Sequence, residues 1–519
     1  MTYAVKHFFS FCLAVAQCFP IFILIHCGKS EQISCDNTQI WGPGLDPENV
    51  IMPARYFFIK CYDFNNNSLN LSPGKDIYQV QISGDKEPIC RIWLNILESK
   101  DGLFIVRYKV LSACKNLRIS VKCKGKELPI SPVKFTGNTY PDDCSCLVNE
   151  DVNNWMEKYR CGKDFSQIRK DLDKFDDIDF DSLLPTAEKT LFKDALSKSV
   201  CHYLIKNNKI YRNCHGQYTG FKMFMDAILL FFSRKVRLPD MEMLVNLGDW
   251  PLIKKSSSND TILPLFSWCG SDDTHDIVMP TYDITESSLE NMGRVTLDML
   301  SVQGNIAKTW NDKIEKLFWR GRDSSRERLH LISLSRQHND IINASLTDFF
   351  FFKNLENEYG PREKRISFFD FFDYKYQINL DGTVAAYRFP YLLVSDSLIF
   401  KQDSPYYEHF YKDLTEWKHF VPVKRDLSDL VEKVKWALAN DEEAREIAQK
   451  GQEFARNNLL PHDIFCYHIQ LFKEYSKKFV AKNITVRPGM EEVKQNKMQK
   501  QCQCEDSKKT SSSRTFEDL

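Results

Sequence analysis

The sequence predicts a two-part molecule, in which an all-β sandwich precedes a larger α/β region. Five segments between residues 36 and 139 alternate apolar and polar residues and are separated by turn-forming residues. From about residue 162, strand-like and helix-like segments alternate, which is typical of a parallel sheet covered by helices. The chain has 519 residues, more than one hydrophobic core can hold, so several domains are expected.

The N-terminal residues are typical of a secretory signal. Lys6 and His7 precede an apolar segment, 8–25, and the expected cleavage near Cys27-Gly28 makes residues 1–27 a predicted signal peptide. The apolar segment is longer than in most signals, so an uncleaved anchor is the alternative. Because no other segment is apolar enough to span a bilayer, we expect a soluble, lumenal mature chain without stable membrane insertion.

Cysteines and glycosylation sequons favour the same compartment. Of the 17 cysteines, 14 remain after the predicted signal, an even number that suits disulfides. The sequence ends in FEDL, which is similar to the KDEL-type retention address and predicts the endoplasmic reticulum lumen. Five sequons are candidate glycosylation sites: Asn66, Asn70, Asn259, Asn343 and Asn483.

The charge balance excludes some partners. Lys+Arg and Asp+Glu both total 70, so the formal net charge is zero and no nucleic-acid partner is expected. The segment FDDIDFD, 175–181, contains Asp-x-Asp, a pattern that could bind Mn²⁺ or Mg²⁺. Because no strand precedes it and lysines surround it, we interpret it as a solvated acidic segment. No metal site is predicted.

The domain order follows from these patterns. Residues 36–139 form the predicted sandwich, and their segments GPGL, KDGLFIVRYKV and KELPISPVKF resemble a filamin-type immunoglobulin-like repeat. No catalytic constellation is visible there, so a structural or partner-binding role is expected. Residues 140–485 form the α/β region, which begins with a cysteine-bearing linker. The Lys-, Gln-, Ser- and Glu-rich segment 486–519 is predicted to be a disordered tail.

Individual elements of the α/β region are also predicted. MEMLVNL and LPLFSW are typical of buried strands, and ESSLENMGRVTLDML and NIAKTWNDKIEKLFW of helices. The segments DLVEKVKWALAN and EEAREIAQKGQEFARNNL have amphipathic spacing and are expected to be the last helices.

Two segments are candidate anion sites. YQINL-DGT-VAAYRFPYLLV-SDSLIF predicts a strand, a glycine turn, a helix and a strand, so that the helix N-terminus would suit a phosphate. Arg388, within that helix, could reach the same anion, or it could pair with a surface acid. LFWRGRDSSRERLHL, 317–331, places four arginines beside a glycine and two serines. Composition alone favours an exposed helix start over an anion pocket there.

A carboxylate follows one of the predicted strands. Asp249 follows MEMLVNL after one glycine, Gly248, and ligands of α/β sheets bind beyond the carboxyl ends of strands. With Trp250 limiting water, Asp249 could accept a proton from a hydroxyl. The alternative, favoured on local grounds, is an ordinary turn aspartate before Pro251. The pair His275-Asp276 is a further cleft candidate, although such a pair is more often structural.

Several long motifs in a fixed order carry a family resemblance. RLPDMEMLVNLGDWP, FWRGRDSSRER, KYQINLDGTVAAYRFPYLL and SLIF resemble the Rumi-like protein O-glucosyltransferases over about residues 140–485. The resemblance implies a GT-B fold with two Rossmann-like halves and an inverting reaction that uses a UDP-sugar and no metal. The filamin-type repeat and KDEL-like tail match the subgroup that modifies serines of EGF-like repeats, of the Notch type, in secreted and cell-surface proteins. UDP-glucose and UDP-xylose are both possible donors.

The resemblance assigns roles to residues. Asp249 corresponds to the general base, although Gly248 stands where relatives can have arginine. Arg328 and Arg388 correspond to donor-phosphate contacts. His275, Asp276 and Trp250 are expected to line the cleft. The remaining predicted donor-binding residues are Gly382, Thr383, Val384, Ala385, Ala386, Arg320 and Gly321.

Two further expectations concern disulfides and the alternative function. Cys466 is expected to pair with the linker cysteines Cys144, Cys146 or Cys161, and Cys201 with Cys214. The alternative to an enzyme is a weakly active chaperone or lectin-like binder of EGF-like repeats. Such a binder needs no base, so the presence of Asp249 together with both arginines favours the enzyme.

Overall fold

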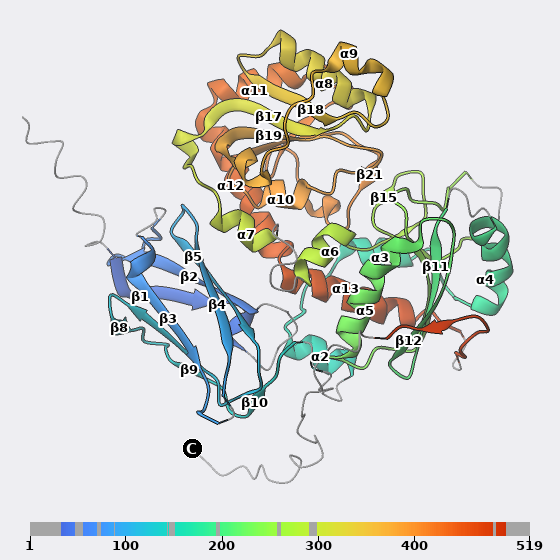
Figure 1. Cartoon of the computed structure of the whole chain (residues 1–519), viewed down its shortest axis with the longest axis horizontal. Coiled ribbons are helices and arrows are strands. Elements are labelled where there is room, and N and C mark those ends of the chain that lie inside the picture. Colours follow the sequence, from blue (N-terminus) through green and yellow to red (C-terminus); the bar gives the residue numbers. More distant parts are fainter. Residues whose placement is uncertain are drawn as a thin grey trace, which may run out of the picture.

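The computed structural model describes residues 33–46, 55–69, 74–87, 89–142, 144, 151–193, 198–256, 261–289, 298–480 and 484–494. The predicted signal peptide and the FEDL terminus lie outside these ranges. Figure 1 shows three bodies, which are a β-sandwich and two α/β halves joined by helices.

The N-terminal body is the predicted sandwich. One sheet has the strand order β1-β2-β5-β4 and the other has β3-β7-β8, with β9 paired to β7. The disulfides Cys35–Cys123 and Cys90–Cys114 fasten it. The strands are β1 (Ile33–Trp41), β2 (Arg55–Asp63), β3 (Tyr78–Ser83), β4 (Ile92–Glu98), β5 (Leu103–Val110), β6 (Cys114–Lys115), β7 (Arg118–Cys123), β8 (Lys126–Glu127), β9 (Val133–Lys134) and β10 (Asn138–Thr139), which pairs with β6.

The β2–β5 pair is buried on both faces. Phe57 and Phe104 pack inside the sandwich, whereas Tyr56 and Ile105 on the opposite face belong to the core of the α/β region. The apolar runs RYFFI and LFIVRY reflect this, because strands covered on both sides need apolar residues at every position. The predicted apolar–polar alternation was therefore wrong for these two strands.

The first α/β half contains a mixed sheet. Its order is β16-β14-β13-β11-β12-β23, with β13, β14 and β16 parallel and the other pairs antiparallel. Both predicted strands of this half are confirmed as β13 and β14. The elements are α2 (Val152–Lys158), α3 (Ser166–Leu172), α4 (Phe180–Ala187), β11 (Val200–Lys206), β12 (Lys209–His215), α5 (Lys222–Ser233), β13 (Met241–Asn246), β14 (Leu265–Ser267), β15 (Gly270–Ser271), β16 (Ile277–Val278), α6 (Tyr282–Ser288), α7 (Met299–Gly304) and β23 (Glu491–Glu492).

The second half contains a five-stranded, wholly parallel sheet of order β18-β17-β19-β20-β22. The predicted order, an all-β domain followed by an α/β region that contains two sheets, is thus confirmed. The elements are β17 (Ile314–Arg322), α8 (Arg326–Gln337), β18 (Ile342–Asp348), α9 (Glu356–Tyr359), β19 (Tyr374–Asn379), α10 (Phe389–Leu393), β20 (Leu398–Gln402), β21 (Tyr406–Tyr407), β22 (Val421–Val423), α11 (Leu430–Ala439) and α12 (Asp441–Asn458). The next helix, α13 (Pro461–Ser476), packs against α2, α3 and α6 of the first half.

The segment NIAKTWNDKIEKLFW was predicted to be a helix, and that prediction was wrong. Its second half is β17, the strand that pairs with both β18 and β19 in the middle of the sheet. The β-forming residues Phe318 and Trp319 are completely buried there. Burial in a central strand therefore outweighs the amphipathic spacing of the charged residues before it.

Three connections join the two halves. α7 leads into the second half, and the continuous pair α12 and α13 returns to the first half. β15 of the first half also pairs antiparallel with β21 of the second. Both predicted disulfides of the α/β region are confirmed, because Cys161 in the linker pairs with Cys466 in α13, and Cys201 pairs with Cys214 across β11 and β12.

The predicted start of the disordered tail at residue 486 was too early. Residues 491–492 form β23, an edge strand paired with β12. Just before it, the Arg487 guanidinium contacts the carboxylates of Glu242 and Asp181. Charged side chains that pair with partners in the folded body are ordered despite a polar local composition.

The sequons have different surroundings. Asn66 lies exposed in a turn. Asn343 lies half-buried in β18, where its Nδ2 donates to the Tyr374 hydroxyl at 3.0 Å, so the atom that would carry a glycan is engaged. Asn70, Asn259 and Asn483 lie outside the described residues.

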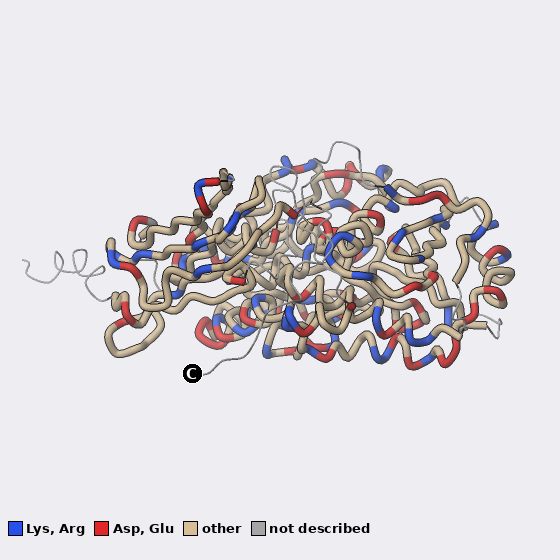
Figure 2. Tube along the Cα trace, turned by 90° about the horizontal axis from the view of Figure 1, so that it is seen from below, with Lys and Arg blue, Asp and Glu red and all other residues tan. Residues whose placement is uncertain are grey.

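Charges of both signs are distributed along the whole described chain (Figure 2), as the zero net charge suggests. Among the described helices, none has both the length and the apolar character needed to cross a bilayer.

Candidate active site

A cavity of about 400 Å³ lies between the two α/β halves. The turns after β13, β17 and β19 contribute to it, so it lies beyond the carboxyl ends of strands from both sheets. The first half contributes Asp249, Tyr282 and Asp283. The second half contributes Arg322, Ser324, Arg328 and the segment Gly382, Thr383, Val384, Ala385, Ala386, Tyr387 and Arg388.

Asp249 is held by the turn that ends β13. Asn246 Oδ1 accepts from Gly248 N at 2.9 Å, and its Nδ2 donates to Trp250 O at 2.7 Å, which fixes the turn around the aspartate. The half-buried Asp249 carboxylate accepts a hydrogen bond of 3.3 Å from the Tyr282 hydroxyl. Burial raises the pKa of Asp249, and the Tyr282 hydrogen bond partly opposes that rise. Asp249 is therefore a partly desolvated carboxylate at the cavity rather than a fully solvated turn residue.

Helix α6 adds two residues that the sequence analysis missed. The Tyr282 ring stacks on Phe224 and meets Trp268 and Tyr387 edge-on, so its hydroxyl is rigidly placed. Asp283 is accessible from the cavity, but the surrounding protein and the nearby Asp249 charge raise its pKa to about 6. The sequence signal, a threonine N-cap followed by an acid in the first turn, is the same as that of any ordinary helix start.

Arg328 is the most buried cation of the site. It belongs to the first turn of α8, whose N-cap Ser325 accepts from its backbone N–H. Its guanidinium donates to the carbonyl oxygens of Asp381, Leu380 and Arg322 and to the Ser324 hydroxyl. Burial, with the neighbouring Arg388 charge, lowers its pKa to about 9.

Arg388 lies beside Arg328, because both guanidinium groups approach the ring of Trp319. The Cζ atom lies 5.9 Å from the ring centroid in Arg388 and 5.3 Å from it in Arg328. The one described hydrogen bond of Arg388 is a 2.8 Å donation to the Arg320 carbonyl. Burial lowers its pKa to about 10, although Asp283 raises it. Within the described chain, every hydrogen-bond acceptor of Arg328 and Arg388 is a carbonyl or hydroxyl oxygen and none is a carboxylate. No carboxylate therefore forms a hydrogen-bonded ion pair with either guanidinium, although the charge of Asp283 acts on Arg388.

The predicted helix after the glycine turn begins later than expected. Residues 382–388 form turns, and α10 starts at Phe389 with Pro390 in its first turn. A proline is tolerated in the first turn but not in a helix interior, so a helix from Val384 to Val394 was not possible. The turn is compact at Gly382, where a Cβ would lie 3.2 Å from Arg328 Nη2. The predicted positive helix end therefore does not face the cavity at Gly382, and the arginines supply the charge instead.

Arg320 and Gly321 do not line the cavity. The Arg320 guanidinium donates to the carbonyl and the side chain of Asn343 in the neighbouring strand. Gly321 packs against the Trp319 ring, which a Cβ would meet at 2.6 Å. A register shift between Gly321 and Arg322 reorients the chain, so that Arg322 and Ser324 reach the cavity. The structure thus brings Arg322 and Ser324 of this segment to the cavity and leaves the Arg320 and Gly321 side chains outside its lining.

The other cleft candidates, His275, Asp276 and Trp250, lie outside the lining of the cavity that contains Asp249. The buried Asp276 carboxylate accepts from the backbone N–H groups of Leu252 and Ile253 and from the Ser267 hydroxyl, so it anchors the segment after Asp249. His275 lines a different cavity, and Trp250 is 52% exposed. Asp276 therefore has a structural role, and neither His275 nor Trp250 lines the site cavity.

The acidic segment 175–181 has a structural role. Asp179 caps α4 by accepting from Asp181 N, and Phe180 is buried. Among the described residues, no three His, Cys, Asp or Glu side chains are grouped as metal ligands. A metal-free reaction stays a prediction.

Comparisons with known proteins agree with this arrangement. The model of the glycosyl transferase family 90 matches residues 156–518, and that of the filamin/ABP280 repeat matches residues 32–134. Protein O-glucosyltransferase 2 of Danio rerio is 50% identical over 464 residues, 89% of this chain and 91% of that protein. Protein O-glucosyltransferase 3 of Homo sapiens is 45% identical over 479 residues, 91% and 93% of the two chains. Protein O-glucosyltransferase 1 of Homo sapiens is 33% identical over 305 residues, 56% of this chain and 76% of that protein.

Proposed function

The chain belongs to glycosyl transferase family 90, and we propose that it is an inverting, UDP-sugar-dependent transferase that adds glucose to serine hydroxyls of EGF-like repeats. The observation that carries this proposal is the cavity in which Asp249 of one half faces Arg328 and Arg388 of the other. A base and a cationic anion site on opposite sides of one cavity are what a transfer from a nucleotide-sugar to a hydroxyl requires.

The proposed reaction is a single displacement. Asp249 accepts the proton of the serine hydroxyl while the serine oxygen bonds to the anomeric carbon. The bond between that carbon and the β-phosphate oxygen breaks, and its electron pair leaves with UDP. Attack opposite to the leaving group inverts the anomeric centre. The raised pKa of Asp249 makes it a stronger base than a solvated carboxylate.

Arginines of the second half would stabilise the negative charge of the leaving UDP. Arg328, Arg388 and the exposed Arg322 line the same cavity as the turn 382–386. Guanidinium groups bind phosphate oxygens through paired N–H donors, and their fixed positions stabilise the negative charge that develops on UDP. In this proposal no metal is needed, because the arginines supply the positive charge.

We further propose that the chain acts in the endoplasmic reticulum lumen. Four described disulfides support an oxidising compartment, together with the predicted signal and the FEDL terminus. Serine-bearing EGF-like repeats of secreted and cell-surface proteins, including Notch-type proteins, would be the acceptors. UDP-xylose is the alternative donor, since it differs from UDP-glucose only by lacking a hydroxymethyl group.

The test is transfer to a folded EGF-like repeat with UDP-glucose and, separately, UDP-xylose. We expect the mass of the repeat to increase by one hexose with UDP-glucose, and the serine to be identified by peptide mapping. A matched repeat with that serine replaced by alanine is the control. Binding of the repeat without any mass increase from either donor would contradict the proposal and favour the chaperone or lectin-like alternative.

A further inference from the structure

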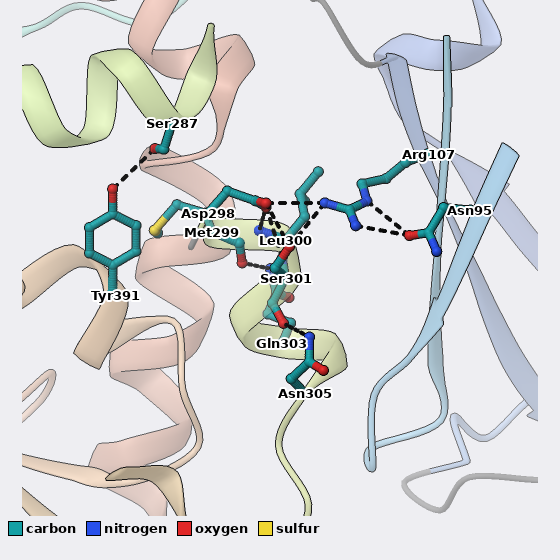
Figure 3. A network of polar contacts seen from close by, with 10 residues as sticks. All are labelled: Asn95, Arg107, Ser287, Asp298, Met299, Leu300, Ser301, Gln303, Asn305 and Tyr391. Atoms are coloured by element: carbon teal, nitrogen blue, oxygen red, sulfur yellow. Dashed lines mark hydrogen bonds and ion pairs between the residues drawn. The ribbon is translucent and has the colours of Figure 1, made fainter. Parts of the chain in front are cut away.

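The β4–β5 hairpin of the filamin-type domain contacts α7, the first connection between the two α/β halves. Arg107 of β5 donates from Nη1 to Asp298 Oδ2 at 3.1 Å and to Ser301 Oγ at 3.0 Å (Figure 3). Its Nε and Nη2 donate to Asn95 Oδ1 of β4, which orients the guanidinium. Arg107 and Asp298 side chains are 15% and 11% exposed, so the ion pair is largely shielded from water.

The hairpin and α7 also pack without a gap. A Cβ placed on Gly304, the last residue of α7, would lie 2.5 Å from the Leu97 Cβ of β4. Asp298 caps α7 through Leu300 N and Ser301 N with one carboxylate oxygen while the other accepts from Arg107. The same side chain therefore fixes the start of the helix and its attachment to the filamin-type domain.

The tip of the hairpin contacts the second connection, α12. Asp101 Oδ2 accepts from Arg456 Nη1 at 2.7 Å, and Arg456 Nε donates to Gln303 Oε1 of α7 at 2.7 Å. Burial alone would raise the pKa of Asp101, but Arg456 lowers it to about 2. The hairpin, α7 and α12 thus form one closed network of hydrogen bonds.

These two helices determine where the donor side of the cavity lies. α10, which begins directly after Arg388, packs against both α7 and α12. Its Tyr391 hydroxyl contacts Ser287 Oγ at 3.0 Å, which connects it to α6, the helix of Tyr282 and Asp283 (Figure 3). A shift of α7 or α12 would therefore change the position of Arg388 relative to Asp249.

We propose that Arg107 and Asp101 of the filamin-type domain are positioning residues for transfer: they hold α7 and α12 and thereby set the donor-binding half relative to Asp249. This inference rests on the proposed function, because it assigns the base and the donor site to different halves. The filamin-type domain then acts as a brace across the connections between the halves.

The proposal predicts a specific kinetic signature. UDP contacts residues of the second half, whereas transfer needs both halves at the correct separation. Removing the contacts of Arg107 and Asp101 with α7 and α12 should therefore lower kcat by about tenfold, since small misplacements of reacting groups have large effects on rate. The Kd of UDP should change by less than about twofold.

The experiment uses the full chain with Arg107→Ala, Asp101→Asn and Gly304→Ala. Arg107→Ala removes the ion pair with Asp298, and Asp101→Asn removes the negative charge that pairs with Arg456. Gly304→Ala forces the hairpin away from α7 by a steric route. Arg107→Lys tests rescue by a conservative change. The control is Arg118→Ala, an exposed arginine of β7 in the other sheet of the same domain. Isothermal calorimetry with UDP gives Kd and the number of sites, and glucosyl transfer to an EGF-like repeat gives kcat.

We expect Arg107→Ala, Asp101→Asn and Gly304→Ala to have one UDP site per chain and a lowered kcat. Arg107→Lys should lose less kcat than Arg107→Ala. Arg118→Ala should have the kcat and the UDP affinity of the wild type. A wild-type kcat in the three variants would overturn the inference and leave the proposed function intact. A kcat that falls only in proportion to the number of UDP sites would also overturn it, because the loss would then reflect unfolded molecules. A wild-type chain that neither binds UDP nor transfers sugar would overturn the proposed function itself.

Discussion

At the scale of single residues, the two arginines of the site differ in how much structure depends on them. Arg328 is buried and donates to three backbone carbonyls and a hydroxyl, whereas Arg388 is half-buried and makes one described hydrogen bond. Both are expected to bind the donor diphosphate, but only Arg328 also holds the surrounding turns together.

Alanine substitution should separate these contributions. We expect Arg388→Ala to weaken UDP binding by about 10- to 100-fold with little change in melting temperature, since a hydrogen bond to a charged group contributes about 1.5–3 kcal/mol. Arg328→Ala should weaken UDP binding and also lower the melting temperature, because buried carbonyls lose their donor. Calorimetry and thermal melts measure both effects. An unchanged UDP affinity in Arg388→Ala would contradict its assignment.

Asp283 should make the stability of the chain depend on pH. Its pKa in the folded chain is about 6, above the ordinary value of 3.8, because the cavity walls desolvate it and Asp249 repels its charge. The folded state therefore holds this proton more tightly than the unfolded state, and stability is lost as the pH rises through this interval. Asp283→Asn should gain stability relative to the wild type between pH 4 and pH 7, measured as denaturation midpoints. A constant difference across that range would contradict the shift.

Sequence reasoning located the residues of the site more reliably than their orientation. Asp249, Arg328 and Arg388 were selected through motifs and all line the cavity. Arg320 and Gly321 were selected from the same motif and do not line it, because a register shift in β17 was invisible in the sequence. Tyr282 and Asp283 were missed because the fold, and not a local pattern, brings α6 to the turn after β13.

At the scale of elements, the start of α8 connects helix stability to the site. Ser325 Oγ accepts from Arg328 N at 3.4 Å and donates to the Asp381 carbonyl at 3.3 Å. The cap therefore fixes both the helix that carries Arg328 and the turn that carries Gly382.

Removal of the Ser325 cap should affect both the stability of the chain and its affinity for UDP. Ser325→Ala is expected to lower the free energy of unfolding by about 1 kcal/mol, as for other N-caps, and to raise the Kd of UDP. Ser325→Asn, which keeps a capping oxygen, should retain most of the stability. Chemical denaturation and calorimetry provide the two readouts. Equal stability of Ser325→Ala and wild type would show that the cap contributes nothing.

Elements were predicted well where burial and periodicity agree. The strand MEMLVNL and the amphipathic helices α11 and α12 lie where the sequence places them, although α13 follows them and they are not the last helices. The segment that forms β17 was predicted to be a helix, because its charged residues have helical spacing and the neighbours that bury it come from distant segments. Tertiary pairing decides such cases, and a single sequence does not contain it.

At the scale of the whole molecule, distant parts of the chain are fastened to each other. The Cys161–Cys466 disulfide spans 305 residues, whereas Cys201–Cys214 spans 13. The first closes the α/β region by joining its beginning to α13, and the second joins neighbouring strands.

Loss of the long-range disulfide should be the more destabilising of the two. A cross-link restricts the unfolded chain more when its loop is longer, so Cys161→Ala with Cys466→Ala should lower the free energy of unfolding by about 3–5 kcal/mol. The pair Cys201→Ala with Cys214→Ala should cost about 3 kcal/mol or less. Chemical denaturation of both double variants tests this order, and the reverse order would contradict it.

The filamin-type domain was predicted correctly as a fold, but its attachment was not. Its sheet shares a core with the α/β region through Tyr56 and Ile105. The continuous apolar runs of β2 and β5 contained this information, because a free sandwich strand would expose every second residue. The sequence therefore indicates a rigidly attached domain once those runs are compared with the alternating pattern.

In the proposed reaction, Asp249 is the base of a sugar transfer in which the arginines hold the leaving UDP. The most direct measurement is glucosyl transfer to a folded EGF-like repeat in the presence of EDTA by the wild type and Asp249→Asn, with UDP binding measured in parallel. We expect wild-type transfer to survive EDTA, and Asp249→Asn to bind UDP normally while its kcat falls by about 10²–10⁴-fold. Transfer by Asp249→Asn at the wild-type rate, or transfer by the wild type that EDTA abolishes, would contradict this metal-free base mechanism.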